Sequence, residues 1–298
     1  MKVTIGSRGS SLALKQSEEV KNKLLEADPG LDIEIEVIST KGDRILDRPL
    51  NQIGDKGLFT KEIEEKLLDG SIDLAVHSMK DMPSVLKEGL IFAGTIAPED
   101  NRDCLVFNHG YTSLDKLSYG AVVGTGSPRR RTQLLKYRPD LKVVGIRGNI
   151  ETRLKKMVDE NMDAIVLASA GLKRLGLEEK IGQYLDVSVM VPACSQGILA
   201  LQVKNDSWLL PYLEKIADAN GTQRMELERL FLETVGGSCH MPIGANVQFI
   251  KDGIELYCVL GNEEETCLFT HHEIINHDYK KRVQEIAMML KKQVEDHG

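Results

Sequence analysis

The sequence predicts an α/β protein with largely parallel sheets, followed by a smaller α+β region. Over the first two thirds of the chain, short apolar runs alternate with amphipathic stretches, which is the order that helix-covered parallel sheets require. The last third instead carries three β-type runs in succession, separated by Asp252-Gly253 and Gly261-Asn262, which favour hairpin turns. No internal repeat or low-complexity segment competes with this interpretation.

The first α/β unit is expected to begin with a strand at residues 2–6. Apolar spacing then predicts a helix from Leu12 to Leu25, and Gly70 is the expected stop of a second helix. The remaining elements are strands at 33–37, 72–76 and 91–96 and the second helix at 57–69. Pro98-Glu99-Asp100-Asn101 marks the expected boundary.

The second α/β unit is expected to contain three strands, each followed by a helix. The strands are predicted at 121–124, 142–146 and 163–167, with helices from Arg129, after Asn149 and near 169–175. Residues 187–192 are expected to be extended, as a return to the first unit, and 195–219 to be helical with a break at Pro211. The tail is predicted to comprise a helix at 221–235, antiparallel strands at 245–250, 254–260 and 266–270, and a helix at about 278–295.

The composition bounds the function classes. A chain of 298 residues with 42% hydrophobic content can form two or three domains. The formal net charge of −7 argues against a general nucleic-acid binder, which is normally basic. Five cysteines without regular spacing argue against a disulfide framework and fit a reducing cytosol. No CxxC pair or His/Cys cluster indicates a metal site.

The beginning of the chain bears on localisation. It runs directly into an alternating strand, without the pattern of a signal peptide, and no long apolar span follows. We therefore expect a soluble, cytoplasmic protein that does not bind a membrane.

One loop is a candidate attachment site. Cys239 lies between two glycines and a proline, directly after the amphipathic helix at 221–235. Glycine frees the backbone and proline stiffens it, so a thiol there can be exposed and held still at once. A covalent attachment point needs such a thiol, because the thiolate is the reactive form and has to be reachable. A free cysteine in a turn is the alternative interpretation.

Cationic residues follow four of the predicted strands, where open parallel sheets bind their ligands. The loops concerned carry Arg8, Lys80, Arg129, Arg130, Arg131, Arg147 and Arg153. Ser127 and Asn149 are natural N-caps, so two helix N-termini add N–H groups and a positive dipole end. Together the loops predict a cleft between two α/β units that binds carboxylates or phosphates. Any one of these residues taken alone is better explained as structural: Arg8 as a surface charge, and Arg131 as pointing to water.

Asp81 stands out among these cations as a carboxylate beside Lys80 and ahead of Pro83. One interpretation is a loop aspartate in a salt bridge. The other is an anion placed against a positive charge that develops during a reaction, or a group that donates and accepts protons.

These stretches resemble the porphobilinogen deaminase family, also called hydroxymethylbilane synthases, over essentially the full length of the chain. The His77-Ser78-Met79-Lys80-Asp81 and Arg147-Gly148-Asn149 runs are the specific ones. The matching segments are 7–14, 54–59, 73–83, 124–130, 146–153, 192–197 and the Cys239 loop. Their order and spacing are very hard to obtain by chance.

The resemblance implies three domains, two of them like the halves of a periplasmic binding protein around a cleft. Domain 1 would comprise residues 1–97 and 194–214, domain 2 residues 98–193, and a smaller α+β domain 3 residues 215–298. Cys239 would hold a dipyrromethane cofactor through a thioether. On this primer four porphobilinogen molecules would be joined head to tail with loss of ammonia, and the linear tetrapyrrole hydroxymethylbilane would be released for haem biosynthesis.

The resemblance also implies residue roles by matching position. Asp81 would be the catalytic carboxylate, which stabilises cationic pyrrole species and helps to move protons. Each pyrrole bears an acetate and a propionate, so cations and hydroxyls must hold the growing chain. The expected ligands are Arg8, Ser10, Lys80, Thr125, Ser127, Arg129, Arg130, Arg147 and Arg153. Lys56 is expected near the cleft mouth, and Gln196 is expected to face the cleft.

The chain departs from the family pattern at three places. Gly126-Ser127-Pro128 replaces a common Ser-Ser-Leu, which suits a helix start but removes one N–H donor. Cys194-Ser195 replaces Val-Gly, and we interpret Cys194 as a packed small residue. His240 stands where Gln is frequent, and either favours the thiolate of Cys239 or is a turn residue.

Two other function classes are weighed against the enzyme. A non-catalytic binder of a small anion accounts for the arginines but gives no role to Cys239 or Asp81. A binder of anionic polymers is disfavoured by the sequence pI of about 5.6 and by 5% aromatic residues, few for stacking. A monomer is expected from the family rather than from these residues.

Overall fold

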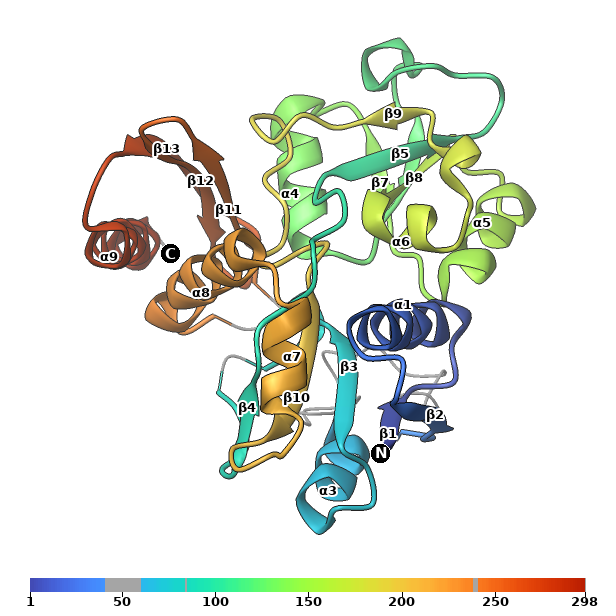
Figure 1. Cartoon of the computed structure of the whole chain (residues 1–298). Helices are drawn as coiled ribbons and strands as arrows, with labels where there is room; N and C mark the ends of the chain where they lie inside the picture. The colour runs from blue at the N-terminus through green and yellow to red at the C-terminus, as the bar shows by residue number, and fades with distance from the viewer. Residues whose placement is uncertain (41–59, 84, 238–240, 298) are drawn as a thin grey trace. The chain divides into compact units, whose positions relative to one another are not determined.

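The computed structural model describes residues 1–40, 60–83, 85–237 and 241–297 (Figure 1). The chain forms two compact units, each made of two stretches of sequence. The first comprises Met1–Glu99 and Gly197–Gln223, and the second Asp100–Gln196 and Arg224–Gly298. The second unit thus contains most of the expected domains 2 and 3, and the division into three domains stays a prediction.

The first unit is built on a five-stranded sheet in the order β2-β1-β3-β10-β4. β1 is parallel to β2 and β3, and β10 is antiparallel to β3 and β4. The strands are β1 (Lys2–Ser7), β2 (Asp32–Val37), β3 (Leu74–Ser78), β4 (Leu90–Phe92) and β10 (Leu199–Lys204), and the helices are α1 (Ser11–Ala27), α3 (Lys61–Asp69) and α7 (Leu210–Ile216). Val20 and Leu24 of α1 are buried in one core with Ile5 of β1, so the helix packs on this sheet.

The second unit contains a five-stranded sheet in the order β7-β6-β8-β5-β9. β6 is parallel to β7 and β8, and β5 is antiparallel to β8 and β9. The strands are β5 (Asp103–Phe107), β6 (Val122–Gly124), β7 (Lys142–Val144), β8 (Ala164–Ala168) and β9 (Gln183–Tyr184), and the helices are α4 (Pro128–Tyr137), α5 (Ile150–Asp159) and α6 (Ser169–Arg174). Leu134 of α4 packs on Val123, and Met157 of α5 packs on Ile165.

Both sheets follow one plan. In each, three parallel strands stand beside a reversed strand and a further edge strand. β5 is the first strand after the chain enters the second unit at residue 100, and β10 is the first strand after the chain returns to the first unit at residue 197. The carboxyl ends of the parallel strands therefore meet along one edge of each sheet, which is where such sheets place their ligand-binding loops.

The remainder of the second unit is α+β, as expected. α8 (Ala219–Val235), which begins in the first unit, leads to β11 (Ile243–Ile250), β12 (Gly253–Gly261), β13 (Leu268–Ile275) and α9 (Tyr279–His297). The three strands form an antiparallel sheet in sequence order. Phe231 of α8 and Ile286 of α9 are buried with Leu256 of the sheet, so both helices contribute to one core.

Three predictions about the segment before α8 were wrong. Residues 199–204 are strand β10 rather than helix, and 187–189 form a turn rather than the expected extended chain. β10 lies between β3 and β4, and five of its six residues are buried, so it lacks the alternation that marks a half-exposed strand. Pro211 stands in the first turn of α7 and so opens a helix rather than breaking one.

Strand β5 was missed because the prediction placed no element between residues 98 and 121. Its five residues, Asp103–Phe107, form a short run without helical periodicity. By contrast, Gly70 ends α3 as predicted, with a φ of 80° in the left-handed region.

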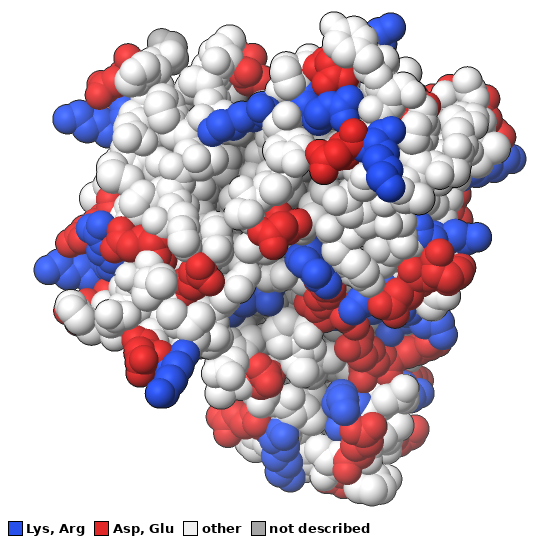
Figure 2. All heavy atoms as spheres, turned by 90° about the horizontal axis from the view of Figure 1, so that it is seen from above, with Lys and Arg blue, Asp and Glu red and all other residues white. Residues whose placement is uncertain are grey.

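Two features are absent from the described part of the chain. No helix there is long and apolar enough to cross a membrane. No group of three or more His, Cys, Asp or Glu side chains among those residues is placed to hold a metal ion. On the face shown in Figure 2, Lys and Arg side chains alternate with Asp and Glu and do not gather into one patch.

Ser195 has a left-handed backbone conformation, which favours glycine. Its φ is 61°, and its buried Oγ has no hydrogen-bond partner in the described structure. Ser195→Gly is expected to stabilise the protein by about 0.5–1 kcal/mol, because the left-handed strain of a side-chain-bearing residue exceeds the entropy cost of glycine. Thermal denaturation measures the gain. Ser195→Ala is the control: it removes the hydroxyl but keeps the strain, and an equal gain from it would refute this explanation.

Candidate functional site

The loops after β6 and β7 lie against each other. Thr125 N donates to Val144 O at 2.9 Å, and a β-carbon on Gly126 would lie 3.0 Å from Ile146 O. Ser127 caps α4, since its Oγ accepts from Arg130 N at 3.4 Å, and its own N–H donates to Thr125 Oγ1 at 3.2 Å. The predicted N-cap is thus confirmed, and α4 directs its N-terminus to this edge of the sheet.

The loop after β7 opens a second helix. Asn149 Oδ1 accepts from Thr152 N at 2.8 Å, which confirms it as the N-cap of α5. Arg147 precedes the cap and is half-buried. Arg153, in the first turn, donates from Nε to Gly148 O at 2.8 Å. Two helix N-termini and two arginines therefore belong to neighbouring loops of one sheet edge, a combination that suits anions.

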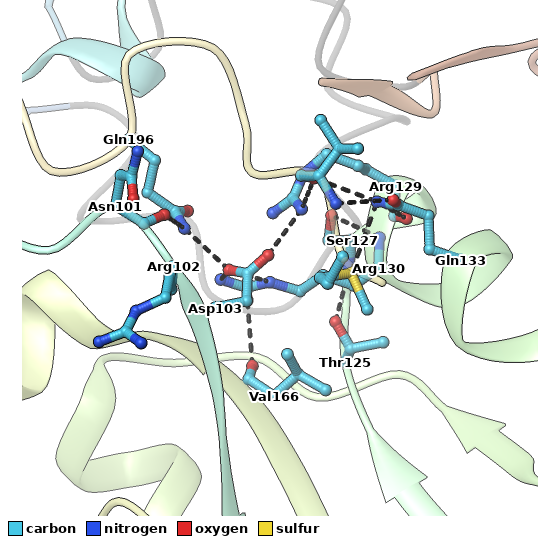
Figure 3. A network of polar contacts seen from close by, with 12 residues as sticks. Asn101, Arg102, Asp103, Thr125, Ser127, Arg129, Arg130, Gln133, Val166 and Gln196 are labelled. Carbon is cyan, nitrogen blue, oxygen red and sulfur yellow. Dashed lines mark hydrogen bonds and ion pairs between the residues drawn. The ribbon is translucent and has the colours of Figure 1, made fainter. Parts of the chain in front are cut away.

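Arg129 and Arg130 converge on one buried carboxylate, Asp103 at the start of β5 (Figure 3). Arg129 Nη1 donates to Asp103 Oδ2 at 2.6 Å. Arg130 donates to Oδ1 from Nη2 at 2.8 Å and from Nε at 3.1 Å. The two guanidinium groups also donate to backbone carbonyls, Arg129 to Val191 O at 2.6 Å and Arg130 to Val166 O at 3.0 Å.

The charges of this cluster do not cancel. Burial alone would raise the pKa of Asp103, but the charges of Arg129 and Arg130 prevail and hold it well below its usual range. Burial in turn lowers the pKa of Arg129, against the opposing effect of Asp103. One carboxylate between two guanidinium groups leaves a formal charge of +1, so the cluster remains attractive to a further anion.

Gln196 joins this cluster rather than standing apart from it. It is 1% exposed, and its Nε2 donates to Asp103 Oδ1 at 2.9 Å and to Asn101 O at 2.7 Å (Figure 3). Three of the predicted ligand residues, Arg129, Arg130 and Gln196, thus share one partner.

Arg129 also packs against the strand that follows the cysteine loop. A β-carbon on Gly244 of β11 would lie 3.1 Å from Arg129 Cδ and 2.5 Å from Pro192 O, so only glycine fits. Arg131, at the next position of α4, pairs with Glu265 at 3.5 Å and donates to Val143 O at 3.1 Å. It is therefore engaged with protein groups rather than pointing only to water.

The first unit presents the other predicted residues at the ends of β1 and β3. Arg8 is half-buried directly after β1, and Ser10 caps α1 by accepting from Ala13 N at 3.3 Å. A 3₁₀ turn, η2 (Met79–Asp81), follows β3; in it Lys80 is half-buried and Asp81 is exposed. Because β1 and β3 are parallel neighbours, these two loops share one sheet edge.

Three residues singled out from the sequence, Lys56, Cys239 and His240, lie outside the described residues. The frame of the cysteine loop is nevertheless informative. Gly236 has a φ of 69°, and a β-carbon on Gly237 would lie 1.9 Å from Ile243 Cδ1. Gly236 therefore has a backbone conformation that favours glycine, whereas a side chain at Gly237 would require the Ile243 side chain to move.

Cys194 is a packed core residue, as expected. It is buried among apolar side chains that include Leu227 and Phe231, and burial raises the pKa of its thiol to about 12. A thiol with that pKa is not a nucleophile near neutral pH.

Asp103 is the residue that sequence reasoning missed. It precedes a short apolar run and carries no motif of its own. The available signal was indirect: two adjacent arginines at a predicted buried helix start require a buried counter-charge.

Comparison with known proteins identifies the family. Residues 3–210 match the family model "Porphobilinogen deaminase, dipyromethane cofactor binding domain", and residues 222–292 match "Porphobilinogen deaminase, C-terminal domain". The chain belongs to the porphobilinogen deaminase family. Two relatives of that name come from Clostridioides difficile (51% identity, covering 89% of this chain and 88% of the relative) and Campylobacter lari (43% identity, 96% and 94%).

Solved structures are more distant. The methionine binding protein MetQ aligns with 14% identity and a TM-score of 0.47, over 76% of this chain and 94% of that one. At that TM-score the likeness adds nothing to the fold described above.

Asp103→Asn is expected to destabilise the protein by about 3–5 kcal/mol, because it leaves two buried guanidinium groups without a counter-charge. Chemical denaturation measures the loss. Glu18→Gln is the control: it removes an exposed pair with Lys15, and should change stability little. Equal effects of the two substitutions would contradict the ion-pair interpretation.

The same variant has a pH signature. Because the folded-state pKa of Asp103 is depressed, the unfolded chain binds a proton that the folded chain does not as the pH falls below the ordinary carboxyl value of about 4. The contribution of the pair is complete above that value and is lost toward the folded pKa. The melting temperature of the unmodified protein should therefore fall more steeply between about pH 4 and pH 2 than that of Asp103→Asn.

Proposed function

We propose that this chain catalyses the porphobilinogen deaminase reaction: it polymerises four porphobilinogen molecules into hydroxymethylbilane and releases ammonia. The match of the family models to residues 3–210 and 222–292 supports this, as do the positions of the predicted residues. The observation that carries the proposal is the sheet edge where two capped helices meet the Asp103–Arg129–Arg130 cluster. Porphobilinogen and its products are polycarboxylates, and this edge is built for anions.

The residues fit the dipyrromethane group that the family model names. Its acetate and propionate groups call for guanidinium, hydroxyl and backbone N–H donors, which the loops of β6 and β7 supply. We assign Thr125, Ser127, Arg129, Arg130, Arg147 and Arg153 to these carboxylates. Cys239 would form the thioether. The group supplies the pyrrole carbon from which the tetrapyrrole grows, and a thioether keeps it attached because, unlike a disulfide, it is not cleaved by thiols.

The arginine cluster contributes orientation in advance of binding. Asp103 and the carbonyls of Val191 and Val166 fix the two guanidinium groups, so no side-chain entropy is lost when an anion binds. Burial also strengthens each interaction with a carboxylate, because little water screens it. Gln196 acts in this proposal through Asp103 rather than by touching the substrate.

Asp81 is assigned the catalytic role. Deamination of an aminomethyl pyrrole generates positive charge on the ring, and an adjacent carboxylate lowers the energy of that charge and accepts protons. Asp81 is exposed on its turn, so substrate can reach it, and Lys80 and Arg8 share the edge to hold substrate carboxylates. Ser10 adds a hydroxyl in the same loop as Arg8, and Lys56 is assigned a place near the entrance.

The remaining assignments follow the family. We propose a monomer that takes porphobilinogen as its small-molecule partner, binds neither nucleic acid nor membrane, and works in the cytoplasm of the haem-producing cell. The three-domain division, with residues 1–97 and 194–214, 98–193, and 215–298, belongs to the same proposal.

Intact mass spectrometry tests the covalent cofactor. The purified protein should exceed its sequence mass by two pyrrole units, and Cys239→Ser should not. Cys267→Ser is the matched control, since Cys267 is a partly buried thiol of the same unit and should leave the added mass unchanged. A protein whose mass equals that of its amino acids, even after incubation with porphobilinogen, would refute the proposal.

Asp81→Asn separates catalysis from cofactor binding. It should retain the extra mass and lose about 10²- to 10⁴-fold in kcat, the range of a lost general acid–base group. Asp69→Asn, at the end of α3, is the control and should turn over normally. Full activity of Asp81→Asn would remove its assigned role.

A further inference from the structure

A line of buried polar side chains crosses the α3 side of the first sheet, and the reaction as proposed above makes no use of it. Ala75 packs in the core formed with Ile63 and Leu67 of α3, and His77 lies on the same face of β3 because side chains alternate along a strand. His77 is 7% exposed, and Glu64 of α3 is 6% exposed. Polar groups buried in an apolar core destabilise it unless they bond one another.

Gln202 of β10 connects these two side chains. It is paired with Ala75 across the ladder and Ala200 is paired with His77, so Gln202 is a diagonal neighbour of His77 on one face. Gln202 Nε2 donates to Glu64 Oε1 at 3.0 Å. Helix α3 and strands β3 and β10 are thus joined through one amide.

The carbonyl oxygen of the Gln202 amide is the partner of the His77 imidazole. Within the described residues, Gln202 Oε1 and His77 Nε2 are both buried without a partner at ordinary hydrogen-bond distance and angle. They are complementary as acceptor and donor, and Gln202 raises the pKa of His77 as a bonding partner does. We interpret the contact as one weak bond from an Nε2–H tautomer to the amide oxygen.

His77 keeps this donor over the working pH range. Burial lowers its pKa to about 4; the bond with Gln202 opposes this effect, and the charge of Arg8 adds to it. A neutral imidazole carries one N–H, and the order His77, Gln202, Glu64 gives each donor an acceptor. The last member of this series is the Glu64 carboxyl group, whose Oε1 accepts the bond from Gln202 Nε2.

The bonded side chains His77, Gln202 and Glu64 meet β3 directly before the proposed catalytic turn. Ser78, next to His77, accepts from Gln16 Nε2 of α1 at 2.8 Å, and Met79 N donates to Ile198 O at 3.0 Å. The turn Met79–Asp81 follows at once. Bonds on three sides therefore fix the end of β3, and the side chains His77, Gln202 and Glu64 supply a polar link to α3.

We propose that His77, Gln202 and Glu64 are positioning residues, which set the orientation of the Met79–Asp81 turn and so of Lys80 and Asp81. This rests on the proposed function. Apolar side chains would fill the space at least as stably, whereas a bonded polar chain permits one arrangement of the strand end. A catalytic carboxylate needs that constraint, because a displacement of about 1 Å can cost about 100-fold in rate.

The test compares His77→Leu with His77→Gln in cofactor-loaded protein. His77→Leu removes the donor and should lower kcat by about 10- to 100-fold, with KM and the cofactor mass little changed. His77→Gln returns an N–H near the position of Nε2 and should restore most of kcat. Gln202→Leu should reproduce the effect of His77→Leu, and it serves as the second variant where His77→Leu does not fold.

Ile63→Val is the matched control for stability, because it loosens the same core without touching the polar chain. It should lower the melting temperature and leave kcat unchanged. The proposal is overturned if Ile63→Val loses as much kcat as His77→Leu, if both His77 variants lose equally, or if neither loses. An unmodified protein that carries no cofactor and releases no tetrapyrrole would instead fail the proposed function, and this inference with it.

Discussion

The structure of the second unit depends on one buried carboxylate between two guanidinium groups. Arg129 and Arg130 are adjacent on α4, and burying two like charges side by side is untenable without an opposite charge. Asp103 supplies it from the reversed strand β5, whose antiparallel pairing with β8 brings residue 103 beside residue 168. The antiparallel direction of β5 therefore places the Asp103 carboxylate at the start of α4, beside Arg129 and Arg130.

This arrangement prepares the proposed anion site before any anion arrives. The guanidinium groups are desolvated and oriented by Asp103, by backbone carbonyls and, through Gln196, by the segment at Asn101 (Figure 3). The desolvation that a flexible surface lysine would undergo on binding has already occurred during folding. Arg129 also packs against β11, the strand that follows the Cys239 loop. The small antiparallel sheet therefore helps to fix the position of the arginine side chain.

The features that could be predicted from the sequence were those set by residues close to one another in the chain. Ser127 and Asn149 cap helices, and Gly70 ends one, because each acts within a turn of its own position. Asp103 could not be assigned, since its partners lie 26 and 27 residues away and no spacing rule links them. The prediction of β10 was wrong for a related reason. A strand that is covered on both faces shows no alternation of apolar and polar residues, so only its partners in the sheet distinguish it from a helix.

The two sheets share one plan of strand order but hold their aspartates in different environments, one buried and one exposed. A carboxylate buried beside two guanidinium groups is held ionised far below neutral pH and is useless for moving protons, as Asp103 illustrates. A carboxylate meant to accept protons has to remain in contact with water and substrate. Asp81 meets this condition on an exposed turn of the other unit. Binding and proton transfer demand opposite environments for an aspartate, and under the proposed assignments each sheet supplies one of them.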